Sequence, residues 1–459
     1  MTLRPYQVTG SKFLQNNEYS LLCDDAGSGK SAMVLDAMHA LGLRRVLCVG
    51  PAVAGVSWPR QVAEWGHGEK YTDIEIAGNF GFGAPGFYFV SFDLLSRVDR
   101  VSLCDALNSV HWDALVIDEG QYLKTPGSNR TAAVYGDQLD GGKNTGNALA
   151  FGPDRVWVLS GTLTPNHAGE AYTHLRALFP GTLAKIPAFK GLVPELWEFE
   201  NRFCRMQHTQ WGRVATGSQN TRELRTAMAP VLMRRLKRDI IPDLPPLDFF
   251  TAPITLERVT VDAIYREMLR RADVAFDMAV HCTDNVEDDI LAHILEDSAN
   301  AAAARRHLGL AKIGPCADWI EERLHAGEPK ILVGALHTDV IKGLEERLLD
   351  HDPVVFHGAT SHADRIENVR KFQEDPRCRV FIGHIKAAGT AITLTAAKCV
   401  FFAEFRGTPG DNYQFASRAH RMGQKDGVQA YFATVANSLD ERLAKSAERR
   451  AREIAEIFD

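Results

Sequence analysis

The sequence predicts an α/β fold with two parallel-sheet lobes and helical protrusions between them. Short apolar runs recur in both halves of the 459-residue chain, and each is followed by polar turns and a helical pattern. Continuous apolar strands that alternate with helices are typical of parallel sheets covered on both faces. Two such series, separated by a stretch of different character, indicate two lobes.

Each lobe is expected to take its strands from five apolar runs. Those of the first lobe lie at 19–23, 45–50, 86–91, 113–118 and 155–160. Those of the second lobe lie at 330–335, 353–356, 378–383, 398–403 and 428–433. Between them, 286–307 is predicted to be helical, and prolines around 239–247 mark the link between the lobes. We therefore place lobe 1 at 1–184, protrusions and linker at 185–329, lobe 2 at 330–437 and a C-terminal packing helix at 438–459.

Composition limits the cellular setting and the kind of surface. No apolar run approaches the roughly eighteen residues of a membrane span, and the N-terminus lacks a secretory signal. The eight cysteines form no C-x-x-C pair, which argues against zinc and a disulfide framework and favours a reducing, cytoplasmic location. The net charge of −6 argues against a surface coated in basic residues, so any nucleic acid would have to bind in a local groove.

A glycine loop after the first apolar run indicates a nucleotide site. Cys23 leads into Asp24–Ser31, and a helical pattern follows. Backbone N–H groups of such a loop and the dipole of the following helix bind phosphates. We expect Lys30 to bind the β- and γ-phosphates of ATP and Ser31 to ligate Mg²⁺. Asp24 stands where the strict motif has its first glycine, so a turn that opens an ordinary helix is the alternative.

Two further groups suit phosphoryl transfer. The apolar run 114–117 ends in Asp118, which can hold Mg²⁺, and Glu119, which can polarise the attacking water. In the second half, Arg418 and Arg421 are three apart, a spacing that places them on one helix face. Arginines from a second lobe stabilise charge on the γ-phosphate in many such enzymes. Solvent-facing pairs are the alternative for both groups.

These pieces, in this order, resemble helicase superfamily two, and in detail the Swi/Snf-type DNA translocases with their annealing-helicase branch. The segment 3–7 is similar to the opening motif of the family, and Asp24–Ser31 is similar to its D-E-x-G-x-G-K-T loop. In the second half, 387–397 looks like motif V of the annealing branch and 405–424 like the passage into R-x-H-R-x-G-Q. The resemblance covers nearly the whole chain.

The resemblance implies two RecA-like lobes and a DNA-dependent ATPase that translocates on double-stranded DNA without obligatory strand separation. The implied ATP-binding residues are Arg4, Gln7, Ala26, Gly27, Ser28, Gly29, Lys30, Ser31, Gly389 and Gln414. The implied DNA-binding residues, which contact mainly the phosphate backbone, are Pro51, Ser57, Gly161, Thr162, His357, Gly358, Thr360, Thr390 and Thr393. Less specific candidates, which could equally be ordinary surface residues, are Lys124, Asn129, Arg130 and Lys386.

The basic run 234–238 has two readings that the sequence leaves open. It could contact DNA phosphate, or it could pair with acidic residues where the lobes join. The chain also departs from the family pattern. Gln121 replaces the histidine after Asp118-Glu119-Gly120, and Leu163 replaces a proline. Ala416 and Ser417 stand where the family usually has acidic residues.

Alternatives to the translocase remain at this point. One is a helicase that separates or anneals strands, and another is a catalytically weak DNA-binding scaffold. A third is a motor subunit that serves a separate nuclease chain. For the translocase we expect ATP and Mg²⁺ as cofactors, double-stranded DNA as the partner, no membrane, and a monomer.

Overall fold

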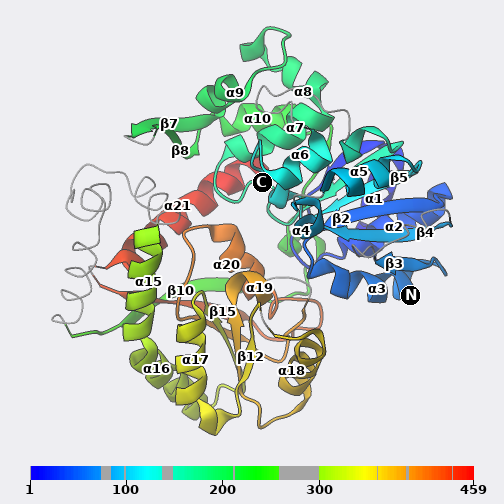
Figure 1. The fold of residues 1–459 in the computed structure, drawn as a ribbon. Helices are drawn as coiled ribbons and strands as arrows, with labels where there is room; N and C mark the ends of the chain where they lie inside the picture. Colours follow the sequence, from blue (N-terminus) through cyan, green and yellow to red (C-terminus); the bar gives the residue numbers. More distant parts are fainter. Residues whose placement is uncertain are drawn as a thin grey trace. The chain divides into compact units, whose positions relative to one another are not determined.

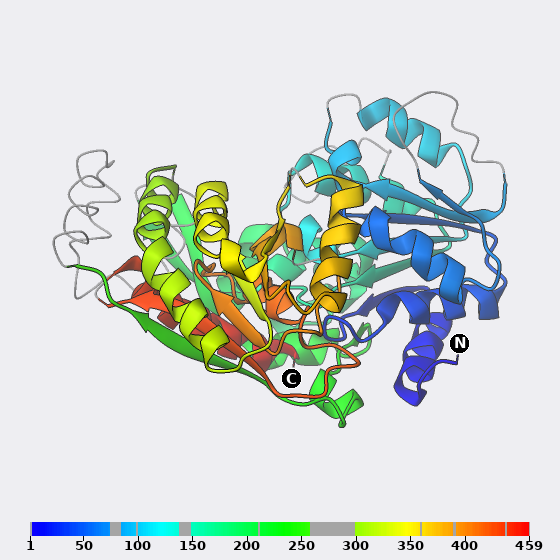
Figure 2. The ribbon, with the colours of Figure 1, turned by 90° about the horizontal axis from the view of Figure 1, so that it is seen from below.

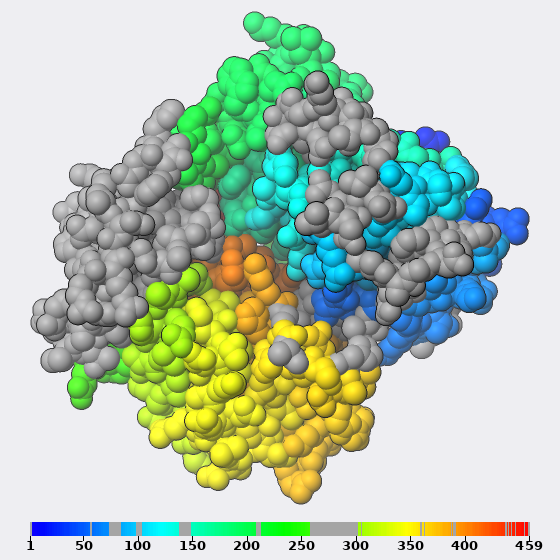
Figure 3. Space-filling model, viewed as in Figure 1, coloured from blue at the N-terminus to red at the C-terminus, as the bar shows by residue number. Residues whose placement is uncertain are grey.

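A computed structural model describes residues 2–73, 84–97, 100–136, 148–209, 212–257, 299–358, 360–388, 392–436 and 438–458. The chain divides into two compact units. Unit 1 comprises residues 1–240 and 453–459, and unit 2 comprises residues 241–452. In the space-filling view of Figure 3 the described residues are coloured and the others are grey.

Unit 1 is built on a seven-stranded sheet in the order β3-β4-β2-β5-β6-β1-β9, and all neighbouring strands are parallel (Figure 1). Its strands are β1 (Tyr19–Leu22), β2 (Arg45–Gly50), β3 (Tyr71–Asp73), β4 (Gly86–Ser91), β5 (Ala114–Asp118), β6 (Arg155–Leu159) and β9 (Leu232–Met233). Alternate residues face opposite sides: Leu115 packs in one core cluster and Val116 in the other. Both faces are apolar because helices cover both.

The helices of unit 1 flank this sheet and extend beyond it. They are α1 (Pro5–Asn16), α2 (Lys30–Leu41), α3 (Ala54–Trp65), α4 (Phe92–Leu95), α5 (Arg100–Asn108), α6 (Asn129–Tyr135), α7 (Tyr172–Leu178), α8 (Pro180–Ala184), α9 (Leu196–Phe203), α10 (Thr221–Met228) and α11 (Lys237–Ile240). Helices α1 to α3 cover one face and α5 to α7 the other. An antiparallel hairpin of β7 (Cys204–Thr209) and β8 (Gly212–Ser218) follows α9.

Unit 2 is built on a six-stranded parallel sheet in the order β10-β15-β14-β11-β13-β12. Its strands are β10 (Leu247–Ile254), β11 (Ile331–Ala335), β12 (Val354–Phe356), β13 (Val380–His384), β14 (Cys399–Phe402) and β15 (Val428–Val435). Its helices are α15 (Ala299–Ala311), α16 (Ile313–His325), α17 (Thr338–Arg347), α18 (His362–Glu374), α19 (Ile385–Ala388), α20 (Pro409–Ala416) and α21 (Leu439–Phe458). Figure 2 shows the green β10 beside the red β15.

The expected fold class of two parallel-sheet α/β lobes is confirmed. All ten apolar runs form strands, and their ends differ from the expectation by at most two residues. The stretch 185–329 also supplies β9 and β10, which each join a main sheet, although neither is buried along its length. Strand β10 lies at a sheet edge and exposes four consecutive residues, so it lacks the buried pattern. Of the helix expected at 286–307, residues 286–298 lie outside the described part, and α15 covers the rest.

The C-terminal packing helix is present as α21, and its last turn belongs to unit 1. The Glu453 carboxylate pairs with Arg205 and accepts a hydrogen bond from the backbone N–H of Ser218 at 2.9 Å. The Thr221 hydroxyl donates to Glu456 at 3.2 Å, and Ile457 is fully buried in the unit 1 core. Both the charged and the apolar side of this last turn are therefore used in packing.

Seven described cysteines are buried and none of them is in a disulfide: Cys23, Cys48, Cys104, Cys204, Cys316, Cys378 and Cys399. Buried free cysteines of this kind act as small core residues. Among the described helices, none combines the length and the apolar character needed to cross a membrane.

A buried histidine makes the stability of unit 1 sensitive to acid. His174 is fully buried beside Tyr135, whose hydroxyl lies 2.8 Å from Nδ1, and burial lowers the pKa of His174 to about 4. In the unfolded chain the pKa is about 6.5, so between these values only the unfolded chain takes up the proton. Stability is therefore complete above pH 7 and falls as the pH drops through this window, by about 2 kcal/mol at pH 5.

Chemical denaturation of wild type and His174→Gln at pH 7.5 and pH 5 tests this. Glutamine can still bond to Tyr135 but does not titrate, so the variant is expected to lose about 2 kcal/mol less than wild type between the two pH values. An equal loss in both proteins would show that other groups cause the acid sensitivity.

Candidate active site

Three of the loops that carry predicted site residues follow strands at one edge of the unit 1 sheet. Because the strands are parallel, their carboxyl ends lie together. Asp24–Ser31 follows β1, Glu119 follows β5 and Ser160 follows β6, and these strands are neighbours in the order β5-β6-β1. The fold thus brings Asp24–Ser31 and Asp118-Glu119 together with the segment that contains the DNA-contact candidates Gly161 and Thr162.

The P-loop, defined here as Asp24–Ser31, has the backbone of a phosphate-binding loop. Gly27 and Gly29 have φ values of 83° and 86°, in the left-handed region that favours glycine. A Cβ on Gly29 would lie 2.3 Å from Nε2 of Gln7. Lys30 begins α2, and its Nζ donates to the backbone oxygens of Asp24 at 2.6 Å and Asp25 at 3.2 Å. The N-terminus of α2 is thus available to an anion.

The opening motif lies against the P-loop. The backbone N–H of Arg4 donates to Oε1 of Gln7 at 2.9 Å, while Nε2 of Gln7 donates to the Ser28 carbonyl at 3.2 Å. The Tyr6 hydroxyl donates to the same carbonyl at 2.9 Å. Gln7 is buried, whereas Arg4 is exposed. The structure therefore adds Tyr6 to the predicted pair, on contacts that the local sequence does not reveal.

Asp118 ends β5 in a half-buried position, where its carboxylate can serve as a cation ligand. Burial and, to a lesser extent, the charge of Glu119 raise the pKa of its carboxyl to about 7. The indole N–H of Trp58 donates to Asp118 Oδ2 at 3.0 Å, and the Lys30 charge also favours the ionised form. Trp58 was not predicted, because its link to Asp118 spans 60 residues.

A hydrogen-bonded chain joins Glu119 to the loop after β6. Gln121 Nε2 donates to Glu119 Oε2 at 2.7 Å, and the Ser160 hydroxyl donates to Gln121 Oε1 at 2.6 Å. The backbone N–H of Thr162 in turn donates to Ser160 Oγ at 3.0 Å. Glutamine, in place of the family's histidine, thus supplies the donor and the acceptor that this chain needs.

The basic run 234–238 pairs with acidic residues at its first two positions. Arg234 NH2 lies 3.0 Å from Asp25 Oδ1, and Arg235 NH2 lies 2.5 Å from Asp24 Oδ2. Of the two readings left open by the sequence, acidic pairing is the one that the structure supports for these arginines.

The DNA-contact candidates of unit 1 are spread over several loops. Ser57 lies in the first turns of α3, after Pro51, and its hydroxyl donates to the Ala54 carbonyl at 3.0 Å. The Gly161 carbonyl accepts from Arg234 at 2.8 Å. Lys124 Nζ forms an ion pair with Glu170 at 2.5 Å. Burial alone would raise the pKa of Glu170, but Lys124 lowers it below its ordinary value.

The remaining unit 1 candidates, Asn129 and Arg130, begin α6. The amide of Asn129 donates to the Ser96 carbonyl at 3.1 Å, and the guanidinium of Arg130 lies over the Tyr122 ring. The DNA-binding role of every residue named for unit 1 stays a prediction.

In unit 2, a tight turn follows β12. Thr360 Oγ1 accepts from the backbone N–H of His357 at 3.0 Å, and Gly358 is exposed. Arg365 donates to the carbonyls of Thr360 at 2.9 Å and Gly358 at 3.1 Å. Lys386 is exposed in α19, after the neighbouring strand β13. These candidates share one edge of the unit 2 sheet.

Arg418 and Arg421 do not lie on a helix, so that part of the expectation was wrong. Helix α20 ends at Ala416, and both arginines lie in the turns that follow. The backbone oxygen of Arg418 accepts from Leu394 N at 2.8 Å, and Arg421 NH1 donates to Thr393 Oγ1 at 3.0 Å. The turn conformation reflects tertiary bonds that override the spacing pattern. Gly389 and Thr390 lie outside the described residues.

The departures from the family pattern have a common structural setting. Leu163 is 1% exposed in the unit 1 core, and Ala416 and Ser417 are fully buried in unit 2. Gln414, the last predicted ATP-binding residue, is also buried, in α20. These three positions therefore accommodate a small or apolar side chain, whereas Gln121 is polar and half-buried.

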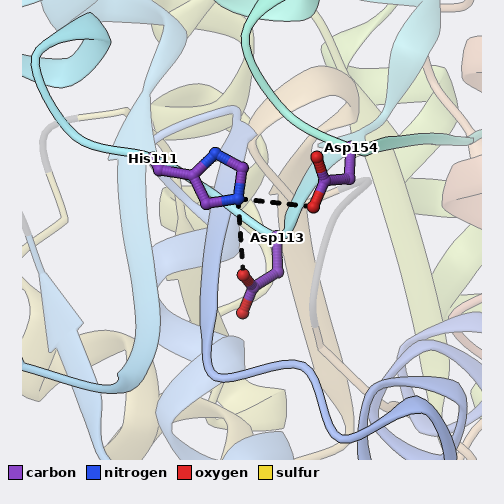
Figure 4. Close-up of side chains that lie close together, drawn as sticks. All are labelled: His111, Asp113 and Asp154. Carbon is purple, nitrogen blue, oxygen red and sulfur yellow. Dashed lines mark ion pairs between the residues drawn. The ribbon is translucent and has the colours of Figure 1, made fainter.

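His111, Asp113 and Asp154 form a cluster of possible metal ligands at the opposite edge of the unit 1 sheet (Figure 4). His111 Nε2 lies 3.3 Å from Asp154 Oδ2 and 3.8 Å from Asp113 Oδ1. Asp113 Oδ2 also accepts from the backbone N–H groups of Arg44 and Arg45. The His111 side chain is 54% exposed, so we interpret the cluster as a surface ion pair that ends the strands.

Comparison with protein-family models decides the family. The model of the SNF2-related domain matches residues 6–302, and that of the helicase conserved C-terminal domain matches residues 317–423. The chain belongs to the SNF2-related family. This confirms the expected family and the enzyme class, the ATPases of helicase superfamily two.

Several curated relatives of this SNF2-related chain are longer proteins. The DNA annealing helicase and endonuclease ZRANB3 of Bos taurus is 24% identical over 95% of this chain and 39% of that protein. SWI/SNF-related matrix-associated actin-dependent regulator of chromatin subfamily A-like protein 1 of Xenopus tropicalis is 27% identical over 96% of this chain and 43% of that protein. The chain thus spans less than half the length of either relative.

A solved structure of the same family is also similar. The Sulfolobus solfataricus SWI2/SNF2 ATPase core in complex with dsDNA is 20% identical, with a TM-score of 0.44, over 100% of this chain and 97% of that chain.

Proposed function

We propose that this chain is a DNA-dependent ATPase that uses ATP hydrolysis to translocate on double-stranded DNA, without obligatory strand separation. The observation that carries the proposal is that the P-loop, Glu119 and the predicted DNA-contacting segment at Gly161 and Thr162 meet at the carboxyl edge of neighbouring strands β1, β5 and β6. Family membership makes ATP hydrolysis the expected chemistry, and the name of the ZRANB3 relative associates that protein with DNA.

The P-loop fits ATP and Mg²⁺. Two left-handed glycines, Lys30 and the N-terminus of α2 form a cradle for phosphates. Ser31 and Asp118 would hold the ion, because a hydroxyl and a carboxylate are oxygen ligands that a hard cation favours. Mg²⁺, when bound, would neutralise charge on the phosphates. Gln7 and Tyr6, bonded to Ser28, would keep the P-loop in place.

Glu119 would orient and polarise the attacking water. Its carboxylate is held by Gln121, which is bonded through Ser160 to the backbone of Thr162. Thr162 belongs to a predicted DNA-contacting segment, so this chain of bonds would join the state of Glu119 to DNA contact. Arg418 and Arg421 stay predictions as the arginines that act in phosphoryl transfer.

Double-stranded DNA is the proposed track, gripped mainly through its phosphates. The candidate contacts are small residues, hydroxyls and backbone N–H groups, such as Gly161, Thr162, Gly358 and Thr360. Such groups fit phosphate contact rather than recognition of base sequence. Unit 1 carries the first two of these candidates and unit 2 the last two.

ATP turnover measured with duplex, single-stranded and forked DNA, and with RNA, tests the proposal. We expect turnover to rise sharply with duplex DNA and to vanish in Lys30→Ala. A triplex-displacement assay should then show ATP-dependent removal of the third strand. Equal turnover with and without DNA, or displacement that needs no ATP, would refute translocation.

A forked duplex separates the proposal from its alternatives. A translocase leaves the strands paired, whereas a strand-separating helicase releases one strand in an ATP-dependent reaction, and an annealing enzyme joins complementary strands. A chain that binds duplex DNA without hydrolysing ATP would instead be a scaffold.

A further inference from the structure

Backbone hydrogen bonds join the segment that follows strand β9 to the start of the P-loop. The backbone N–H groups of Cys23 and Asp25 donate to the carbonyls of Met233 and Arg235, at 2.7 and 3.2 Å. The P-loop therefore continues the pairing of β1 with β9 beyond the ends of both strands. Arg234 and Arg235 project from this paired segment, and their side chains return to the same loop.

Arg235 binds Asp24 through two parallel hydrogen bonds. Its Nε lies 3.1 Å from Oδ1 and its NH2 lies 2.5 Å from Oδ2, the bidentate geometry that arginine forms with a carboxylate. Asp24 is fully buried. A buried carboxylate is costly unless it is paired and hydrogen-bonded, and Arg235 provides both kinds of partner.

The same guanidinium also binds the helix that carries the opening motif. Arg235 NH1 donates to the Tyr6 carbonyl at 2.8 Å, and the guanidinium lies over the Tyr6 ring at 5.8 Å from its centre. Tyr6 in turn donates to Ser28 within the P-loop. Arg235 therefore links Asp24 to α1, the helix whose Tyr6 binds Ser28.

Arg234 forms a parallel set of bonds one residue earlier. Its NH1 donates to the carbonyls of Cys23 at 2.7 Å and Gly161 at 2.8 Å, and its NH2 pairs with Asp25. The second Asp25 oxygen accepts from the backbone N–H of Lys237 at 2.9 Å. Both acidic residues at the start of the P-loop are thus paired from the same segment.

The pairing of Asp24 matters for phosphate binding because Asp24 also contacts Lys30. Its backbone carbonyl accepts from Lys30 Nζ at 2.6 Å, so the position of Asp24 affects where the phosphate-binding lysine lies. An unpaired carboxylate at the start of the loop would also repel the phosphates by its charge. The pair with Arg235 both fixes the position of Asp24 and neutralises the charge of its carboxylate.

We propose that Arg235 is a positioning residue for nucleotide binding, which it supports by holding Asp24, and through it the P-loop, in a phosphate-binding conformation. This inference rests on the proposed function and adds a residue, distant in sequence, to the same site. The pair Asp24–Arg235 would take over the loop-shaping role of the glycine that the P-loop lacks at position 24.

Nucleotide affinity in single and double variants tests the proposal. Titration of the full chain with a fluorescent ATP analogue gives Kd, and steady-state turnover with duplex DNA gives KM and kcat. Arg235→Met is expected to raise Kd and KM about tenfold, with a smaller change in kcat. Asp24→Asn should also weaken binding, and the double variant should be no weaker than Arg235→Met, because the pair is already broken.

The controls separate positioning from a general loss of structure. Arg222→Met, at an exposed position of α10 in the same unit, should leave Kd unchanged. Arg235→Lys keeps the charge and should bind with intermediate affinity, and it serves if Arg235→Met does not fold. A role in folding alone would lower the active fraction and kcat at unchanged Kd, and that result would overturn the proposal.

Binding needs no hydrolysis, so the two hypotheses can fail separately. A wild-type chain that binds the analogue but shows no DNA-stimulated turnover would refute the proposed function and leave the Arg235 comparison valid. Equal affinity of wild type, Arg235→Lys and Arg235→Met would refute the positioning role alone. A wild-type chain without nucleotide affinity would refute both.

Discussion

Replacement of Glu119 with glutamine is expected to lower ATP turnover by a factor of about 10²–10⁴, the usual contribution of a positioned general base. Glutamine has the same size but cannot accept a proton from the attacking water. The side chain should remain in place, because Gln121 and Ser160 hold this position by hydrogen bonds. Steady-state turnover with duplex DNA in excess measures the effect.

The backbone at Glu119 supports a specialised role. Its φ of 54° lies in the left-handed region, which costs a residue other than glycine of order 1–3 kcal/mol and persists where surrounding structure enforces it. Gly120 follows without room for a side chain, since a Cβ there would lie 2.4 Å from Val158. The turn after β5 is thus fixed on both sides of the carboxylate.

Two comparisons make the Glu119 result specific. Glu119→Gln should retain affinity for a fluorescent ATP analogue, because Lys30 and the P-loop are unchanged. Glu374→Gln makes the same chemical change at a side chain that is 66% exposed in unit 2 and should leave turnover unaltered. Normal turnover in Glu119→Gln would contradict the assignment of Glu119 as the base.

The sheets could be predicted because their strands are buried on both faces. A run such as 45–50 is apolar at consecutive positions, and its ends coincide with those of β2. Strand β10 gave no such signal: Asp248, Phe249, Phe250 and Thr251 are exposed at the edge of the sheet. Strand β9 has only two residues, too few to form a pattern. An apolar run therefore indicates that a strand is buried, and a strand that is exposed or very short leaves no such pattern in the sequence.

Some residues of the candidate site could likewise be proposed from local sequence, whereas others could not. Lys30, Ser31, Asp118 and Glu119 could be proposed from the sequence because each lies in a short motif at the end of an apolar run or shortly after it. Arg235 could not be assigned, because it lies 211 residues from Asp24 and pairing at that distance depends on the order of strands. The left-handed backbone of Glu119 and the turns around Arg418 likewise come from tertiary bonds, which spacing does not encode.

Unit 2 contains a buried ion pair whose disruption is expected to be strongly destabilising. Lys312 Nζ donates to Asp440 Oδ2 at 2.8 Å and to the Ala433 carbonyl at 3.2 Å, and the Lys312 side chain is 2% exposed. Burial alone would lower the pKa of Lys312, but the Asp440 carboxylate raises it above its ordinary value. The lysine is therefore charged, and it joins the start of α16 to β15 and α21.

Lys312→Met is expected to destabilise unit 2 by about 3–5 kcal/mol, because it leaves the Asp440 carboxylate buried without its partner. The double variant Lys312→Met/Asp440→Leu should recover much of this loss, since two apolar side chains need no charged partner. Urea denaturation of the full chain, with hydrogen exchange followed in α16 and β15, measures both.

The control variant Arg347→Met breaks an exposed pair with Asp318 and should cost no more than about 1 kcal/mol. If Lys312→Met and Arg347→Met lowered the free energy of unfolding equally, the buried pair would be no more important for stability than the exposed pair, and the prediction would be wrong.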